Sequence, residues 1–228
     1  MDLNETDDHN RLRLKVVACG VFEPELRALA AQSQNDVDLL FLDAGLHEHP
    51  DRLRRQLQHA IDEAEGGSYD VVIAAYGLCG RGTAGIVARD IPIVFLRVHD
   101  CITLFLGSKA AYMSEFSHHP GTFYITSGWY EKKVRHPQLA GKRNPSSSRP
   151  EDDGRFAGWA ARFGEDGARF LVRFYDSWKH NYTRAAYIDT AQEQSERADC
   201  EQYTQYLASA MGWHYERLDG NTALLADA

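Results

Sequence analysis

The sequence has little of several features that would assign a protein to a class at once. It has 228 residues with only four cysteines, and no hydrophobic run approaches the roughly 20 residues that a membrane-spanning helix needs. Its formal net charge at pH 7 is -8, which argues against a nucleic-acid-binding surface, because contacts with phosphate groups need basic residues. We therefore expect neither nucleic acid nor a membrane among its partners.

The first ten residues are not expected to be a targeting signal. Residues 1–10 are polar and acidic and do not have the basic and then apolar layout of a signal peptide. We expect a disordered lead-in over 1–10, followed by a single α/β domain over 11–228 in a cytoplasmic protein. Residues 141–154 contain two prolines, three serines and three acidic residues, and they predict a loop insertion in that domain.

Known catalytic and metal-binding motifs are absent as well. The chain has no Walker loop, no His-Glu-x-x-His helix, no Cys-x-x-Cys pair and no recognisable Ser/His/Asp arrangement. Structural disulfides are not expected in a cytoplasmic chain. The function must therefore be sought in scattered residues that the fold brings together.

Short apolar runs alternate with helical patterns, and this alternation predicts the fold. In the first half, runs typical of buried parallel strands cover 13–19, 38–42, 70–76 and 93–98. In the second half, strands are expected at 122–126, 184–188, 213–217 and 222–225, and a long helix capped by Ser195 at 195–211. The pattern predicts an α/β fold with a mostly parallel, Rossmann-like, doubly wound sheet and helices on both faces.

Three of the four cysteines follow strand-like runs. Cys19 ends the first run, Cys79 follows the third, and Cys101 follows the fourth, two residues after His99. Because the carboxyl ends of parallel strands meet at one edge of a sheet, these side chains are expected to converge there. Thiolate and imidazole groups favour zinc, and thiolates also hold iron-sulfur clusters, so we predict a site for zinc or, alternatively, a cluster. The alternative is that the cysteines are small core residues and that His99 is solvated.

The third run leads into a glycine-rich turn. Residues 80–85 match the pattern G-x-G-x-x-G between a strand and an expected short helix, which predicts contacts from Gly80, Gly82 and Thr83 to an anion or nucleotide. No convincing ribose-binding acid follows. The alternative is that these glycines only let the turn pass close to another part of the backbone.

Charged side chains near the same strand ends suggest a substrate class. Arg81 and Arg97 would make this edge electropositive, which suits a small anionic substrate and lowers cysteine pKa values. His47 follows the second strand and could serve as a ligand or general base. Such a histidine could equally cap a helix or face solvent.

Several of these motifs resemble an uncharacterised family, domain of unknown function 1638. The resemblance rests on Ala-Cys-Gly at 18–20, Gly-Leu-His at 45–47, Tyr-Gly-Leu-Cys-Gly-x-Gly at 76–82 and Arg-Val-His-Asp-Cys-Ile at 97–102. It covers most of the chain, and residues 144–153 look like an addition. The family brings no established activity, but its association with corrinoid and methylamine metabolism implies a link to one-carbon chemistry and a corrinoid protein as a partner.

Together these patterns predict a metalloenzyme of one-carbon or methyl-group metabolism. Cys19, Cys79, His99 and Cys101 would hold the metal. Zinc methyltransferases that activate a thiol use a His-x-Cys pair with a distant cysteine, and the ligand types here are the same although their order differs. Two alternatives stay open at this point: a non-catalytic metal or corrinoid carrier or sensor, and a nucleotide-binding protein that uses the turn at 80–85.

Overall fold

The computed structural model describes residues 11–136, 155–191 and 193–228. The expected lead-in at 1–10 and the expected loop insertion at 141–154 lie outside these ranges. The chain divides into two compact units: unit 1 comprises Met1–Tyr112 and Gly220–Ala228, and unit 2 comprises Met113–Asp219. Each unit is described by itself, and the prediction of a single domain stays a prediction.

Unit 1 is built on a four-stranded parallel sheet with the strand order β2-β1-β3-β4. Its strands are β1 (Arg13–Cys19), β2 (Asp36–Leu42), β3 (Val71–Ala75) and β4 (Ile93–Phe95). All four were expected from the apolar runs, and β1 has the predicted bounds. The central strands β1 and β3 are the most buried, as expected for strands that are covered on both faces.

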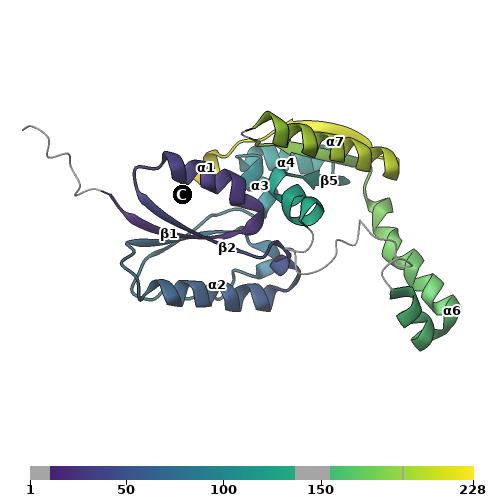
Figure 1. Ribbon diagram of the computed structural model, residues 1–228, viewed down its shortest axis with the longest axis horizontal. Helices are drawn as coiled ribbons and strands as arrows, with labels where there is room; N and C mark the ends of the chain where they lie inside the picture. The colour runs from purple at the N-terminus through teal and green to yellow at the C-terminus, as the bar shows by residue number, and fades with distance from the viewer. Residues whose placement is uncertain (1–10, 137–154, 192) are drawn as a thin grey trace, which may run out of the picture. The chain divides into compact units, whose positions relative to one another are not determined.

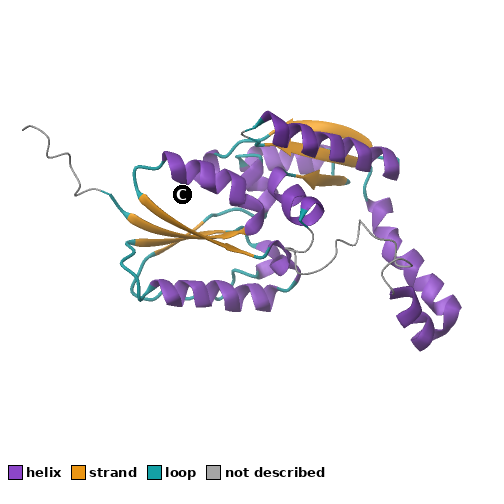
Figure 2. Cartoon of the chain, viewed as in Figure 1, coloured by secondary structure: helices purple, strands orange, loops and turns teal. Residues whose placement is uncertain are grey.

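Two helices cover the sheet of unit 1 on opposite faces (Figure 1). Helix α1 (Glu23–Gln32) has Pro24 in its first turn, together with acidic residues that favour the N-terminal end of a helix dipole. Helix α2 (Pro50–Ala64) buries Leu53, Leu57 and Ile61, whose four-residue spacing forms one apolar face. This face packs on Val17, Val72 and Ala74 of the sheet in one hydrophobic core, an arrangement that Figure 2 makes visible as a strand layer between helices.

Short elements follow the strands of unit 1 at their carboxyl ends. They are η2 (Gly20–Phe22), η3 (Ala44–Glu48), η4 (Cys79–Arg81), α3 (Cys101–Phe105) and, from the end of the chain, α8 (Ala223–Ala226). The prediction of a strand at 222–225 is therefore wrong. The backbone N–H of Asn221 donates to the Phe105 carbonyl at 2.8 Å, and its side-chain oxygen accepts from the Ala223 N–H at 2.7 Å, so the segment turns into a helix instead of extending.

Unit 2 contains a three-stranded parallel sheet with the order β5-β6-β7. The strands are β5 (Thr122–Ile125), β6 (Arg184–Asp189) and β7 (His214–Asp219), and β6 is buried along nearly all of its length. The helical elements are α5 (Ser127–Tyr130), the π-helix η5 (Glu131–Arg135), α6 (Arg155–Asp176), η7 (Ser177–Asn181) and α7 (Gln194–Met211). Helix α4 (Lys109–His118) spans the boundary between the two units.

Unit 2 contains two long helices, α6 and α7. Helix α6 consists of two helical segments that meet at a kink at Gly164, whose φ is 73°. Helix α7 begins one residue before Ser195, and Glu193, the residue that precedes it, makes no side-chain cap. Leu207 and Ala208 of α7 pack with Ile125, Ala185 and a set of aromatic side chains in the core of the unit. The predicted α/β class with parallel sheets and flanking helices is confirmed.

Candidate functional site

The carboxyl edge of the sheet in unit 1 brings three cysteines to neighbouring strand ends. Cys19 is the last residue of β1, Cys79 lies in η4 after β3, and Cys101 is the first residue of α3 after β4. Strand β3 lies between β1 and β4, so the three chain segments leave the sheet side by side. The thiols are near enough to affect one another electrostatically, because Cys19 and Cys79 both raise the pKa of Cys101. We call this group the thiol site.

The loops that carry Cys79 and Cys101 are held together by their backbones. The N–H of Leu78 donates to the carbonyls of Val98 and His99 at 3.2 and 3.1 Å. A Cβ on Gly77 would lie 2.9 Å from the Cα of Asp100, a distance that real Cβ atoms do not reach. Gly77 is therefore the residue that lets the loop after β3 lie directly against the loop after β4.

Cys79 has an unusual backbone conformation. Its φ is 41° and that of Arg81 is 69°, and within the described ranges no other non-glycine residue has a positive φ. Such conformations are strained for residues with a side chain, and they occur often at functional sites. Gly82, a little further along the same turn, is buried against Leu53 of α2, where a Cβ would lie 2.6 Å from the leucine Cδ2. The turn is thus fixed from both sides around Cys79.

The surroundings of the thiols favour their neutral forms. Burial raises the pKa of Cys79, a hydrogen bond with the Gly77 backbone lowers it, and the charge of Asp100 raises it. Burial also raises the pKa of Cys101 well above its ordinary range, and the nearby Cys19, Cys79 and Asp100 raise it further. No positively charged group is among these causes, so the thiols of Cys79 and Cys101 are protonated at neutral pH.

Tyr76, the residue directly after β3, lies in the same group. It is 3% exposed, and its ring belongs to the core that α2 forms with the sheet. Its hydroxyl group is buried and has no hydrogen-bond partner among the described residues. Burial raises the pKa of Tyr76 well above its ordinary range, and the nearby Cys19, Cys79 and Asp43 raise it further, so the phenol is neutral and can donate.

The histidines expected near the cysteines turn to other partners. The His99 side chain is 76% exposed, stacks on Tyr112 and pairs with Asp100 across 3.5 Å. His47 is exposed, and its Nδ1 lies 2.7 Å from the Ala44 carbonyl of its own 3-10 turn. The pKa shifts of Cys79 and Cys101 do not have either histidine among their main causes.

The prediction of a metalloprotein of one-carbon metabolism is wrong. Within the ranges that the structure describes, no three His, Cys, Asp or Glu side chains are grouped so that they could hold a metal ion. The three cysteines lie at neighbouring strand ends, but they do not form such a group, and His99 turns to solvent. The same finding overturns the zinc, iron-sulfur and methyltransferase interpretations and the alternative of a metal or corrinoid carrier.

The glycine-rich turn does not lead into a helix. Residues 82–85 form turns, and residues 86–92 are not helical. Strand β4 then begins at Ile93. The helix whose N-terminus was expected to bind an anion is therefore absent here, and contacts from Gly80, Gly82 and Thr83 to an anion stay a prediction. Thr83 lies near the Gly77 carbonyl, at 3.5 Å, and Gly82 serves close packing. The simpler interpretation of this turn, glycines that allow a close approach, agrees with these contacts.

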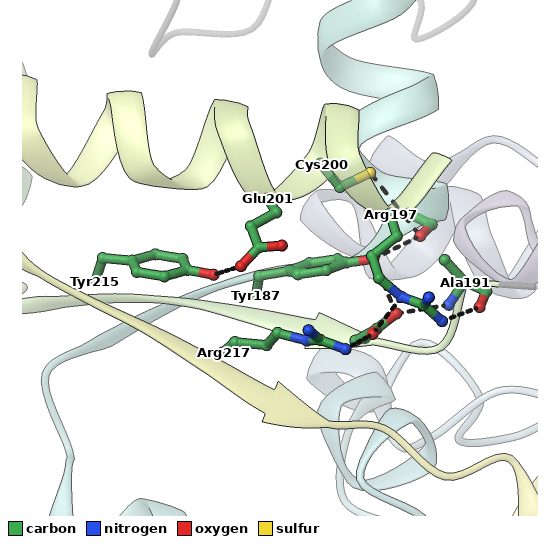
Figure 3. Close-up of polar contacts among 9 residues, drawn as sticks. Tyr187, Ala191, Arg197, Cys200, Glu201, Tyr215 and Arg217 are labelled. Atoms are coloured by element: carbon green, nitrogen blue, oxygen red, sulfur yellow. Dashed lines mark hydrogen bonds and ion pairs between the residues drawn. The ribbon is translucent and has the colours of Figure 1, made fainter. Parts of the chain in front are cut away.

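Unit 2 carries a second polar group, which the sequence patterns did not reveal. Asp189, at the end of β6, accepts hydrogen bonds from Arg197 Nε at 2.7 Å, from Arg217 and from the Tyr187 hydroxyl at 3.2 Å. The Tyr187 hydroxyl lies 3.5 Å from Ser127 Oγ, which in turn lies 3.9 Å from the buried Cys200 Sγ. Figure 3 draws this network between β6, β7 and α7.

This second group is satisfied by its own members. Asp189 is 5% exposed and shares one oxygen between two guanidinium groups. Burial raises the pKa of Cys200 to about 12, and the charges of Glu196, Asp199 and Glu131 add to the effect. Local sequence patterns could not predict this network, because its members are far apart in the chain: Ser127 and Cys200 are separated by 73 residues.

Comparisons with known proteins add a family and two distant structural likenesses. A family model described as "Protein of unknown function (DUF1638)" matches residues 41–228, and a search of curated proteins gives no match. Among solved structures, a candidate Asp/Glu racemase from Yersinia pestis has 11% identity and a TM-score of 0.32, with 94% of this chain and 96% of that chain covered. An aspartate racemase homologue from Pyrococcus horikoshii OT3 has 9% identity and a TM-score of 0.28, with 95% of this chain and 99% of that chain covered. Among the helices that the structure describes, none is long and apolar enough to cross a membrane.

Proposed function

The chain belongs to the DUF1638 family of proteins of unknown function, and we propose that it is a thiol-dependent enzyme. Its reaction is proton transfer to and from a carbon atom of a small anionic substrate, carried out by Cys79 and Cys101. The observation that carries the proposal is the thiol site itself: three adjacent parallel strand ends deliver three cysteines, and the backbone of Cys79 lies in the left-handed region.

The electrostatics of the thiol site favour acid–base chemistry over nucleophilic attack. A cysteine nucleophile is normally activated by positive neighbours that lower its pKa. Here burial raises the pKa of both Cys79 and Cys101. A neutral thiol is a proton donor, and a thiolate in such surroundings is a strong base, which is what removal of a proton from carbon requires.

The two thiols have different roles because they cannot both be charged. A charge on Cys79 raises the pKa of Cys101, so the two ionise in separate steps. Cys79, with the smaller rise in pKa, is the base, and Cys101 is the acid. The Cys79 thiolate takes a proton from the substrate carbon and leaves the electron pair on the substrate. The Cys101 thiol then returns a proton to that carbon.

Two arginines in the loops that carry Cys79 and Cys101 suit an anionic substrate. Arg81 and Arg97 lie in the same two loops as the cysteines, and both are exposed. Across the described part of the chain, neither forms an ion pair, whereas Arg27, Arg89 and Arg169 do. Their guanidinium groups are therefore available to a carboxylate, and such a group next to the reacting carbon would stabilise the negative charge that develops there.

Two measurements on the full chain test the proposal. In D₂O, the protein should exchange the Cα hydrogen of at least one member of a panel of small 2-amino and 2-hydroxy carboxylates. Proton NMR measures this exchange as the loss of the Cα proton signal. Cys79→Ser and Cys101→Ser should each lose this exchange, and Cys200→Ser, in unit 2, should keep it. Iodoacetate should alkylate Cys79 with saturation kinetics. Exchange that persists in Cys79→Ser, or alkylation without saturation, would contradict the proposal.

A further inference from the structure

We infer that the hydroxyl group of Tyr76 donates a hydrogen bond to the substrate bound at the thiol site. This inference rests on the proposed function and adds a binding residue to it. Tyr76 directly follows β3, three residues before Cys79, and its side chain is buried beside Cys19, Cys79 and Asp43. It is the inner polar group of the site, whereas Arg81 and Arg97 are exposed.

The first argument is that this hydroxyl has no partner in the protein. Other tyrosines in the described ranges have one: the hydroxyl of the buried Tyr187 donates to Asp189, and that of the half-buried Tyr215 donates to Glu201 at 2.7 Å. The Tyr76 hydroxyl is buried without any. Phenylalanine would fill the same core position without leaving a polar atom unsatisfied, so a tyrosine here indicates an acceptor that is bound from outside.

The second argument is that the ring is held in a fixed place. It packs in the core with Leu46 and Leu57, and its backbone N–H donates to the Ala74 carbonyl at 2.8 Å. The next residue, Gly77, is fixed against Asp100. A donor on a rigid support at the end of a central strand loses little freedom when it binds a ligand.

The third argument concerns the kind of atom that Tyr76 can bind. Its neighbours are two thiols and a carboxylate, and its phenol is neutral, so it acts as a donor toward an oxygen acceptor. The substrate class that fits is a small carboxylate with one oxygen at Tyr76 and its reacting carbon near Cys79. The exposed guanidinium groups of Arg81 and Arg97 would then neutralise the negative charge from the outer side.

Iodoacetate is a probe that contains both the carboxylate and the reactive carbon. The Cys79 thiolate displaces iodide, so a sulfur–carbon bond forms as the carbon–iodine bond breaks and iodide leaves. Saturation kinetics separate the dissociation constant of the reversible complex from the rate constant of alkylation within it. Iodoacetamide has the same size without the charge and reports the reactivity of the thiol alone.

The test compares Tyr76→Phe with the wild-type chain, and Tyr206→Phe serves as a matched control because Tyr206 is 69% exposed on α7. Tyr76→Phe should raise the dissociation constant for iodoacetate about three- to tenfold, the loss expected for one hydrogen bond. The rate of reaction of Cys79 with iodoacetamide should not change, and neither should the melting temperature fall. Tyr206→Phe should match the wild-type chain in every respect.

The outcomes separate this inference from the proposed function. If the wild-type chain reacts without saturation, the proposed function fails, whatever the variant does. If the wild-type chain saturates and Tyr76→Phe has the same dissociation constant, the proposed function stands and the role of Tyr76 is overturned. A variant that melts at a lower temperature with an unchanged dissociation constant also overturns it, because the hydroxyl would then serve the fold through a trapped water. If the phenylalanine variant does not fold, Tyr76→Leu is measured in its place under the same criteria.

Discussion

Gly77 and Asp100 lie with their backbones in direct contact. A Cβ at position 77 would be 2.9 Å from the Asp100 Cα and 3.0 Å from its N and C atoms. Because these are backbone atoms, a side-chain rotation cannot relieve the overlap, and one loop would have to move. This contact sets the position of Cys79 relative to Cys101, whose segments follow Gly77 and Asp100 directly. Proton transfer between two thiols through one substrate carbon depends on such a fixed separation.

Gly77→Ala should therefore move the loop that carries Cys79 away from the loop that carries Cys101. We expect the saturable reaction of Cys79 with iodoacetate to be lost, because the loop after β3 moves away from the loop after β4. The unfolding free energy should fall by about 1–3 kcal/mol, the usual cost of forcing an extra methyl group into close packing. Alkylation kinetics and urea denaturation measure the two effects.

The matched control is Gly158→Ala in α6. A Cβ on Gly158 would have nothing within 4 Å, and the residue lies inside a helix, where alanine is favoured over glycine by about 1 kcal/mol. This variant should be at least as stable as the wild-type chain and should react with iodoacetate as the wild-type chain does. Equal behaviour of the two glycine variants would show that the contact between Gly77 and Asp100 does not organise the site.

The pH dependence of alkylation at Cys79 follows from its surroundings. Burial and the charge of Asp100 raise its pKa, so its thiolate forms only above the ordinary range of a cysteine. The rate of reaction with iodoacetamide should rise about tenfold per pH unit and continue to rise past about pH 8.5, the value for an unperturbed thiol. Asp100→Asn removes the negative charge and should shift the profile to lower pH.

The asparagine variant keeps the structural role of the residue it replaces. Asp100 Oδ1 accepts from the Thr103 N–H at 3.1 Å and so caps α3, and asparagine caps helices equally well. Any shift of the profile then reports charge and not unfolding. A profile that stays in place would mean that burial alone sets the pKa of Cys79.

The convergence of the cysteines could be predicted from the sequence, whereas their chemistry could not. Apolar runs of strand length located β1, β3 and β4, and the ends of parallel strands share an edge, so Cys19, Cys79 and Cys101 were expected at the same edge of the sheet. A metal site needs side chains that point at one centre, and the pattern His-x-Cys does not contain that information. His99 turns to solvent and Tyr112, outside any ligand group.

Other features were not predicted because they depend on contacts between distant segments. The expected helix after Gly85 does not form because Gln58 of α2 binds both the N–H and the carbonyl of Val87, at 2.9 and 3.0 Å, and holds that backbone outside a helix. The polar network of unit 2 joins Ser127 to Tyr187, 60 residues further on. Local sequence patterns locate helices and strands well. They do not show where a distant side chain, such as that of Gln58, will bind backbone groups that would otherwise form a helix.

A buried arginine in unit 2 gives a stability prediction. Arg184 is 4% exposed, forms ion pairs with Glu115 and Glu216, and donates from Nε to Thr122 Oγ1 at 2.8 Å. Arg184→Met would leave two carboxylates without their partner, so we expect a loss of about 3–5 kcal/mol in unfolding free energy. Arg169→Met removes the exposed pair with Glu165 and should cost at most about 1 kcal/mol. Urea denaturation compares the two, and equal losses would contradict this role of Arg184.

Cys200 should limit the stability of the protein at alkaline pH. Burial raises its pKa in the folded state to about 12, whereas an unfolded chain has a thiol pKa of about 8.5. Above about pH 8.5 the unfolded chain gives up a proton that the folded protein keeps, so unfolding becomes easier as the pH rises. The stabilisation that comes from keeping Cys200 protonated is complete below about pH 8.5 and is lost progressively up to about pH 12. Over this range the free energy of unfolding should fall by at most about 1.4 kcal/mol per pH unit.

Replacing Cys200 removes this part of the alkaline slope. Cys200→Ala and Cys200→Ser differ in size and polarity, so their stabilities at neutral pH should differ. Neither side chain titrates in this range, so both variants should lose the same part of the slope between about pH 8.5 and the highest pH at which unfolding is reversible. Part of the slope should remain in both, because Cys101 and Tyr187 also have raised pKa values. Urea denaturation at several pH values measures it, and a slope equal to that of the wild-type chain would mean that Cys200 ionises in the folded protein at its ordinary pKa.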